Sequence, residues 1–477
     1  MDLDYLVIGA GIAGLSFTAL LEKKCVSSGE RIALLEAHSL VGGCASYFFK
    51  DGHHFDAGAT TLSALHPGQP IYELIKSLDL KLDLRKIDPG LIFLFPDKKI
   101  FRHADHEQWK NELSKHFPQI NHQKIWNRIE MINQKGWKLT SLTHQIPLRS
   151  FLDLFSLLHP RYLQSADLLL TLFRSVEDGL DLEKSNPQYR ALINELLFIT
   201  AQNHMNDTPL LMGAMGLSYP SDTHHVMGGM RALCLALKEK CPHLYLNQSV
   251  QEIKSIRGGF EVLTQKRTFT TKKIISTLPI WNNSLLLKNE ITLKNENPDL
   301  AWSAFMLYLT IPKNQEREGL YYQIHCGAIP FCESESFFVS LSHPQDPTRS
   351  QTRQTVTISC HTKTMAWRDL APEIYQHQKE VVAKFILNHL CQHFSLEYLD
   401  CQNIYTATPK TFIHYTQRFQ GLVGGIPHSL KRNPLSYLSD RSRLKNFYQI
   451  GDTQFPGQGI AAVVLGSQNL ISHLFKE

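Results

Sequence analysis

Residues 4–37 read DYLVIGAGIAGLSFTALLEKKCVSSGERIALLEA, and this stretch decides the fold. Two short apolar runs, 5–8 and 32–35, flank a glycine-rich turn and a stretch whose apolar residues recur at helical spacing. The pattern predicts a strand, a tight turn, a helix and a second strand that ends at the acidic residue Glu36. This order is typical of a dinucleotide-binding fingerprint, in which the pyrophosphate lies at the N-terminus of the helix.

Each glycine of the turn has a predicted task. Gly9 lets the chain leave the strand sharply, Gly11 lets a pyrophosphate approach the backbone, and Gly14 lets the helix pack closely on the strand. Glu36 follows Gly14 at close to the ~20-residue spacing expected of the acid that binds ribose hydroxyls. The predicted cofactor contacts from this stretch are Gly9, Ala10, Gly11, Ile12, Ala13, Gly14, Glu36 and Ala37.

A glycine pair follows the fingerprint and indicates which dinucleotide is bound. Gly42, Gly43 and Cys44 come next, and residues 55–58 read FDAG. This order resembles the flavoprotein superfamily of amine oxidases and phytoene desaturases, in which the glycine pair holds the far side of FAD. The resemblance implies non-covalent FAD, bound in part by Gly42, Gly43 and Cys44. Amine oxidases have arginine where this chain has Cys44, so the resemblance is closer to the isomerase and retinol-saturase branch.

Later stretches resemble other FAD-contacting blocks of the same family. Residues 226–233 read VMGGMRAL and resemble the glycine-pair segment of carotenoid desaturases and isomerases. The resemblance implies that the backbone at Val250 holds the adenine and that Thr277 lies in a strand ending against the cofactor. Met227 and Arg231 depart from the usual sequence around the glycine pair, which leaves the substrate open.

The end of the chain carries the second strong signal. Residues 451–460 read GDTQFPGQGI, and an apolar helical pattern follows. The run resembles that of plant and cyanobacterial carotenoid cis–trans isomerases. A helix N-terminus beside the flavin ring would offer N–H groups where charge collects on reduction, and Asp452 would accept hydrogen bonds from ribityl hydroxyls. The predicted contacts here are Gly451, Asp452, Gly459 and Ile460.

These motifs together predict an α/β fold. It consists of a Rossmann-like FAD-binding domain of the glutathione-reductase type and an interleaved mixed α+β substrate-binding domain. The FAD-binding domain is expected to be discontinuous, because long excursions separate its motifs. It is assigned to residues 1–80, 222–285 and 436–477, and the substrate-binding domain, with its helical lid, to residues 81–221 and 286–435.

Hydrophobic periodicity and turn residues predict further elements. They are a helix over 71–80, a hairpin of 91–95 with 100–101, two strands at 244–247 and 249–253 that pair with each other, a long helix over 373–394, and a turn-rich loop over 408–427.

Composition and charge exclude several classes of function. The net charge of the 477 residues is +5 without a dense basic block, so nucleic acid is not an expected partner. No HExxH or similar cluster occurs, and no metal is expected. The nine cysteines include no CxxC pair, which fits reduced thiols in the cytoplasm. No stretch has the ~18 apolar residues that span a bilayer, so any membrane contact would be peripheral and on its inner face.

Residues 148–176 form an unusually apolar segment interspersed with Arg149, Arg161 and Arg174. Three interpretations stay open. The segment could lie in a membrane interface with its arginines among the headgroups, form the lid of an apolar substrate tunnel, or consist of ordinary core helices. The family resemblance favours the membrane interpretation, because desaturases of this group draw lipids from a bilayer.

The resemblance implies an FAD-dependent oxidoreductase that acts on a long apolar polyene or isoprenoid lipid. Cis–trans isomerisation, desaturation and saturation share this scaffold, and the C-terminal run favours isomerisation. A flavin amine oxidase and a non-catalytic escort protein for prenylated partners are the alternatives. No second dinucleotide fingerprint occurs, so electrons would pass to or from a quinone, oxygen or a separate reductase. The oligomeric state is left open.

No side chain is singled out as a catalytic acid or base. Histidines are candidates by residue type alone, and the pair just before the glycine pair at 228–229 would be tested first. The candidates are His53, His54, His204 and that pair, His224 and His225.

Overall fold

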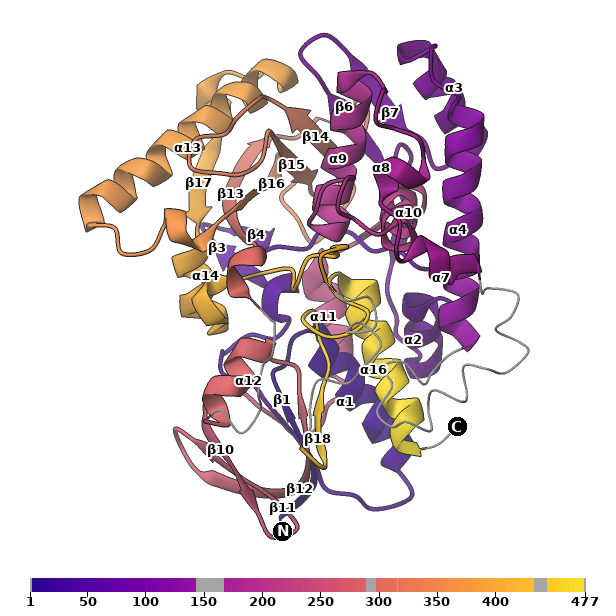
Figure 1. Cartoon of the computed structure of the whole chain (residues 1–477). Helices are drawn as coiled ribbons and strands as arrows, with labels where there is room; N and C mark the ends of the chain where they lie inside the picture. The colour runs from indigo at the N-terminus through magenta and orange to yellow at the C-terminus, as the bar shows by residue number, and fades with distance from the viewer. Residues whose placement is uncertain (1, 143–166, 289–296, 315, 433–443, 476–477) are drawn as a thin grey trace.

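The structure is a computed structural model that describes residues 2–142, 167–288, 297–314, 316–432 and 444–475. Two seven-stranded sheets dominate the described chain, one in the lower half and one in the upper half of Figure 1. Each sheet has its own buried apolar core.

The first sheet has the strand order β10-β11-β12-β1-β2-β9, and β18 also pairs with β12. Strand β1 pairs in parallel with both β2 and β12, and the helix α1 (Ile12–Cys25) connects β1 to β2. Strands that are buried on both faces have continuous apolar sequences, as residues 5–8 of β1 and 32–35 of β2 do. The strands are β1 (Leu3–Ile8), β2 (Ile32–Leu35), β9 (Leu244–Tyr245), β10 (Val250–Ile256), β11 (Gly259–Thr264), β12 (Thr268–Ser276) and β18 (Phe447–Gln449).

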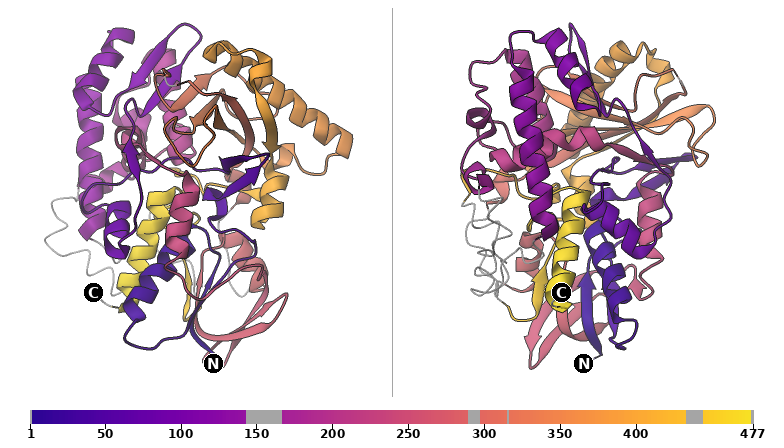
Figure 2. Two further views of the ribbon diagram at one scale, coloured as in Figure 1. Left: turned by 180° about the vertical axis from the view of Figure 1, so that it is seen from behind. Right: turned by 90° about the vertical axis from the view of Figure 1, so that its right-hand side faces the viewer.

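The first and the last helix of the described chain pack side by side on this sheet. Helix α16 (Ile460–Phe475) lies against α1 in both views of Figure 2. The Ser467 hydroxyl on α16 donates a hydrogen bond to the Ala13 carbonyl on α1 at 3.0 Å. The two ends of the sequence therefore build one unit.

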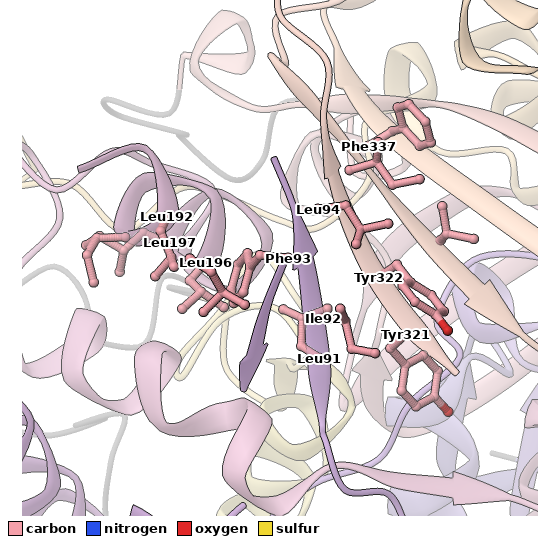
Figure 3. Packing of buried hydrophobic residues seen from close by; sticks show 14 of the residues in the cluster. Leu91, Ile92, Phe93, Leu94, Leu192, Leu196, Leu197, Tyr321, Tyr322 and Phe337 are labelled. Atoms are coloured by element: carbon pink, nitrogen blue, oxygen red, sulfur yellow. The ribbon is translucent and has the colours of Figure 1, made fainter. Parts of the chain in front are cut away.

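The second sheet has the order β17-β13-β16-β15-β14-β6-β7. Helix α9 (Pro187–Ala201) packs on it, and Figure 3 shows Leu196 and Leu197 of α9 beside Phe93 of β6 in one buried cluster. The strands are β6 (Leu91–Leu94), β7 (Lys99–Arg102), β13 (Ser303–Pro312), β14 (Tyr321–His325), β15 (Ser336–Leu341), β16 (Arg353–Thr362) and β17 (Gln402–Ala407).

Two small antiparallel pairs and further helices complete the described chain. The pairs are β3 (Tyr47–Lys50) with β4 (His53–Asp56), and β5 (Leu84–Lys86) with β8 (His224–Val226). The other α-helices are α2 (Pro70–Leu78), α3 (His106–His116), α4 (His122–Leu142), α7 (Asp167–Thr171), α8 (Val176–Gly179), α10 (Leu210–Ser218), α11 (Met230–Lys238), α12 (Ile280–Leu286), α13 (Pro372–Phe394) and α14 (Pro409–Thr416).

Most of the expected elements are present. The fingerprint strands, the helix near 71–80, the hairpin of β6 with β7 and the long helix α13 are all confirmed. The prediction for 148–176 falls largely outside the described residues, which resume at 167. Among the helices that the structure describes, none is both long and apolar enough to cross a membrane. The domain boundaries given above stay a prediction.

Two local predictions are wrong. The strand at 244–247 does not pair with its neighbour in sequence, because β9 extends the edge of the first sheet beside β2, while β10 pairs with β11. Asn247, with a φ of 52°, turns the chain between them. The supposed loop at 408–427 contains the helix α14, because Thr408 and Thr411 form a reciprocal capping box and Pro409 fits the first helical turn.

Candidate active site

One large cavity lies between the two sheets. Its volume is about 1590 Å³, and its wall includes Gly9 of the fingerprint as well as Met306 and Phe338 of the second sheet. Single ligand pockets commonly have volumes of about 300–1,000 Å³. The cavity therefore has room for a dinucleotide and a second, long ligand.

The fingerprint turn forms one end of this cavity. Gly9 has a φ of 94°, which turns the chain out of β1 toward α1. Gly11 caps α1 without a side-chain hydrogen bond, so the first N–H groups of the helix are left to a ligand. The Gly42 N–H donates to the Ala10 carbonyl at 2.8 Å and holds the second glycine segment against the turn. A helix N-terminus of this kind favours a bound anion.

The space around Gly11 and Gly14 shows how the turn fits a pyrophosphate. A Cβ atom added at Gly14 would lie 1.9 Å from the Gly9 carbonyl oxygen, so the protein itself excludes a side chain there. A Cβ added at Gly11 would find its nearest neighbour, the Gly43 Cα, only at 3.9 Å. Gly11 borders the cavity, and the protein leaves the space beside it open. This is the cradle that a dinucleotide phosphate requires.

Glu36 lies at the end of β2 and faces the same cavity. Its Oε2 accepts a hydrogen bond from the Ala10 N–H at 2.7 Å, and its Oε1 accepts one from the His38 N–H at 2.9 Å. Burial raises the pKa of the Glu36 carboxyl, and these N–H groups oppose the rise. Each carboxylate oxygen can accept more than one hydrogen bond, so both can also accept from ribose hydroxyls.

Three more predicted residues border this part of the cavity. The Thr277 hydroxyl donates to the Ile8 carbonyl at 3.0 Å, which ties the end of β12 to the fingerprint strand. Val250 is the first residue of β10 and lies on the wall. Cys44 also faces the cavity, and burial raises the pKa of its thiol.

The C-terminal motif approaches the cavity from another side. Gly451 and Gly459 have φ values of 113° and 93°, and α16 begins directly after the second. Asp452 forms an ion pair with Arg418, a residue that sequence reasoning missed. The sequence signal that could have identified Arg418 was its position within residues 408–427, the run that resembles the carotenoid-isomerase branch. Both side chains are largely buried, and both residues border the cavity.

The structure brings most of the predicted cofactor residues together. All of them except Ala10 and Gly14 line the cavity, and these two are buried, Ala10 in the glycine turn and Gly14 in the first turn of α1. Their contacts with the cofactor stay predictions. Those that line the cavity are Gly9, Gly11, Ile12, Ala13, Glu36, Ala37, Gly42, Gly43, Cys44, Val250, Thr277, Gly451, Asp452, Gly459 and Ile460.

The histidines proposed by residue type do not meet at the cavity. None of the five is among the described residues that line it. His225 is buried instead, with Nδ1 2.8 Å from the Tyr321 hydroxyl, and burial lowers its pKa to about 3. His361 and His428 do line the cavity, and burial lowers the pKa of each to about 4. Both are neutral near pH 7, and the sequence offered no signal for His361.

The part of the cavity beyond the glycine segments is mainly apolar. Its wall is formed by α9, α10 and the second sheet, which contribute aliphatic, aromatic and methionine side chains. Examples are Leu196, Phe198, Leu211, Met212, Met215, Met306 and Phe338. Such a wall excludes water and suits a long hydrocarbon ligand.

Known proteins that are similar in sequence or structure include enzymes of the kind that this site suggests. Residues 7–78 match the family model of an NAD(P)-binding Rossmann-like domain. The chain is 25% identical to prolycopene isomerase 2, chloroplastic, of an Oncidium hybrid cultivar, over 97% of this chain and 82% of that protein. It is 24% identical to the 4,4'-diapophytoene desaturase (4,4'-diaponeurosporene-forming) of Staphylococcus haemolyticus, over 97% of this chain and 96% of that one. Wild-type putrescine oxidase bound to putrescine has a TM-score of 0.66 at 16% identity, with full coverage of both chains.

The fold and the site define an FAD-dependent oxidoreductase with a Rossmann-like cofactor domain. The resemblance to the phytoene desaturase and carotenoid isomerase family is confirmed by the relatives.

Proposed function

We propose that this protein acts on a long apolar polyene or isoprenoid lipid, and that its reaction is a cis–trans isomerisation. The observation that carries the proposal is the continuous cavity of about 1590 Å³, which runs from the glycine turn into an apolar chamber. Similarity to prolycopene isomerases and to a diapophytoene desaturase over nearly the whole chain supports a carotenoid-type substrate. The resemblance of residues 451–460 to the same run of carotenoid isomerases favours isomerisation over desaturation and saturation.

Different parts of the cavity wall would bind the cofactor and the substrate. The N-terminus of α1 would hold the pyrophosphate, Glu36 the ribose, and the segment 451–460 the flavin end. Bound flavin supplies hydride and electron transfer. The apolar wall formed by α9, α10 and the second sheet would align the polyene and exclude water.

We also propose a peripheral membrane contact at α7 and the two residues that follow it. Leu169 and Leu172 border the cavity, and Leu169, Leu170 and Phe173 expose 55%, 76% and 63% of their surface. Large exposed apolar side chains at a cavity entrance suit contact with lipid acyl chains. A lipid substrate would then enter without crossing water. Because an isomerisation causes no net redox change, a quinone or oxygen is proposed only as the partner that exchanges electrons with the flavin to set its oxidation state.

A pigment profile tests the reaction. Cells that make the protein are supplied with phytoene, ζ-carotene or poly-cis-lycopene, and the extracts are separated and weighed by mass spectrometry. A changed cis/trans ratio at constant mass is expected. A shift of about two mass units per step would assign desaturation or saturation instead. Peroxide released from polyamines, with polyenes unchanged, would replace the proposal by an amine oxidase. The Gly11→Ala variant, designed to lose FAD, is the control.

A further inference from the structure

A polar cluster interrupts the apolar wall of the cavity at the second sheet. Glu195 projects from α9, Gln323 from β14 and Ser336 from the start of β15, and all three line the cavity. They are 8%, 4% and 1% exposed. The Ser336 hydroxyl donates to Glu195 Oε2, and Gln323 Nε2 lies 3.4 Å from the same oxygen. The elements that carry the cluster, α9, β14 and β15, lie in the upper half of Figure 1, whereas β1 and α1, which flank the glycine turn, lie in the lower half.

The cluster has hydrogen-bonding capacity that the described residues do not use. Gln323 Oε1 is buried and finds no hydrogen-bond donor among them. Glu195 Oε1 has His325 Nδ1 at 4.0 Å, which is too far for a hydrogen bond, and this nitrogen also has no hydrogen-bond partner in the described chain. A buried polar atom without a partner is unfavourable, so these groups are suited to a ligand that supplies the missing partners.

A second, smaller cavity lies on the other side of Glu195. Its volume is about 650 Å³, and Glu195, Phe198 and Ser334 belong to the walls of both cavities. Its other wall residues are largely polar and include the exposed Glu333 and Glu335. Glu195 therefore stands between an apolar chamber and a polar one, and the polar chamber gives it a route for proton exchange.

The electrostatics of the cluster favour a neutral ligand group. Burial, with a smaller contribution from the nearby Glu335, raises the pKa of Glu195 to about 7, although the hydrogen bonds from Ser336 and Gln323 oppose the rise. A protonated Glu195 donates a hydrogen bond, while Gln323 Oε1 accepts one. A hydroxyl group both accepts and donates, so it satisfies both. An anionic end would meet the field of Glu333 and Glu335, and a hydrocarbon end would leave both groups unpaired.

We propose that Glu195, Gln323 and Ser336 bind the hydroxyl end of a polyene or isoprenoid alcohol, and that they thereby select such alcohols over hydrocarbons of equal length. This inference rests on the proposed function, because it names the substrate class of the same cavity. The apolar chamber between the glycine turn and the cluster would hold the chain of the alcohol.

Ligand binding to the purified FAD-loaded protein tests the site without any turnover. Three polyenes of one chain length are titrated, ending in a methyl, a hydroxyl and a carboxylate group, and quenching of tryptophan fluorescence gives each Kd. The unmodified protein should bind the alcohol about tenfold more tightly than the hydrocarbon, since a site built to bind a hydroxyl leaves its groups unpaired without one. The carboxylate should bind more weakly than the alcohol.

Variants assign the preference to the cluster. Glu195→Leu and Gln323→Leu should each bring the two Kd values within about twofold, chiefly by weakening alcohol binding. Glu195→Gln should keep most of the preference, because an amide also donates and accepts. Glu183→Gln changes an exposed residue on the wall of the polar chamber only and should change little. If Glu195→Leu does not fold, Gln323→Leu and Ser336→Ala give the same test.

Equal affinity for alcohol and hydrocarbon, a preference unchanged in the leucine variants, or tightest binding of the carboxylate would overturn the hydroxyl site. These outcomes leave the proposed reaction standing, because the pigment profile is a separate measurement. A clear alcohol preference together with an unchanged profile of the three supplied hydrocarbons would remove hydrocarbon polyenes as substrates of the proposed reaction and keep the site. Binding of none of the three polyenes would overturn both.

Discussion

Nη2 of Arg418 lies 2.6 Å from Oδ2 of Asp452, and this ion pair joins the segment after α14 to the C-terminal motif. The sequence predicts that Asp452 accepts hydrogen bonds from ribityl hydroxyls. The pair means that Asp452 enters the site with its charge already balanced by a side chain that is itself largely buried. The same ion pair holds residues 417–427, which follow α14, against the cofactor end of the cavity.

Removing one partner of this pair should destabilise the protein strongly. Arg418→Leu leaves the Asp452 carboxylate buried without its cation, and the expected loss in the free energy of unfolding is about 3 kcal/mol. The double variant Arg418→Leu/Asp452→Asn should lose less than the sum of the single variants. Urea unfolding measures each loss. Arg85→Leu, which breaks an exposed pair with Asp83, is the matched control and should cost about 0.5 kcal/mol or less. Additive losses at Arg418 and Asp452 would contradict the coupling.

The two glycines at the start of α1 should respond to alanine in opposite ways. Gly11→Ala meets no protein atom closer than 3.9 Å, so the variant should fold with an unchanged melting temperature and lose FAD. Gly14→Ala places its Cβ 1.9 Å from the Gly9 carbonyl oxygen and should fold poorly. Circular dichroism reports the fold, and flavin absorbance per protein reports the cofactor. Full flavin content in a folded Gly11→Ala protein would refute a phosphate contact at this turn.

Glu36 should contribute to FAD affinity through its charge. Glu36→Gln keeps the size of the side chain but weakens its hydrogen bonds as an acceptor. Because hydrogen bonds to charged groups contribute about 1.5–3 kcal/mol, the Kd for FAD should rise about 10- to 100-fold. Titration of the apoprotein with FAD, followed by flavin fluorescence, measures this change. The exposed Glu239→Gln is the control, and equal Kd values for both variants would show that Glu36 does not bind the ribose.

Glu195 should make stability depend on pH. Its carboxyl titrates near 4.5 in the unfolded chain and near 7 in the folded protein. The folded protein therefore binds the proton more tightly, and the stabilising contribution, fully present below pH 4.5, is lost as the pH rises through 7. Since one pKa unit corresponds to about 1.4 kcal/mol, the loss approaches about 3 kcal/mol by pH 8.

Glu195→Gln isolates this effect from that of the histidines. The lowered pKa values of His361 and His428 change stability in the opposite direction, but they are common to both proteins. Urea unfolding measures the free energy of unfolding at pH 5 and at pH 8. Between these two pH values, the free energy of unfolding of the variant should fall less, or rise more, than that of the unmodified protein. Identical pH dependence in the two proteins would mean that Glu195 ionises normally.

Charges on α7 and on the residues directly after it should weaken membrane binding. Leu170→Asp and Phe173→Asp place a carboxylate on the exposed apolar surface, and co-sedimentation with phosphatidylcholine and phosphatidylglycerol vesicles should fall at least about tenfold. Leu399→Asp, at a leucine that is 85% exposed elsewhere, is the matched control. A loss of vesicle binding in the control as large as in the α7 variants would place the contact somewhere else.

Local patterns predicted the cofactor half well, because glycine turns and strand periodicity act over a few residues. The prediction of β1, α1 and β2 needed only neighbours in sequence. The pairing of β9 with β2 joins segments about 200 residues apart, so sequence proximity wrongly suggested β10 as the partner. For the same reason, the sequence could not show that Glu195 and Gln323, which are separated by 128 positions, lie together. Residue type alone could not tell the buried His225 from a catalytic base.

The pairing of β18 with β12, and the packing of α16 on α1, affect how the protein matures in the cell. Strands β1 and β18 are separated by about 440 residues, and at roughly 5–20 residues per second their synthesis lies tens of seconds apart. During that time the glycine turn exists without the segment that completes the flavin end. Ribosome-bound chains should therefore hold FAD poorly, and cofactor loading should follow the synthesis of the last helix.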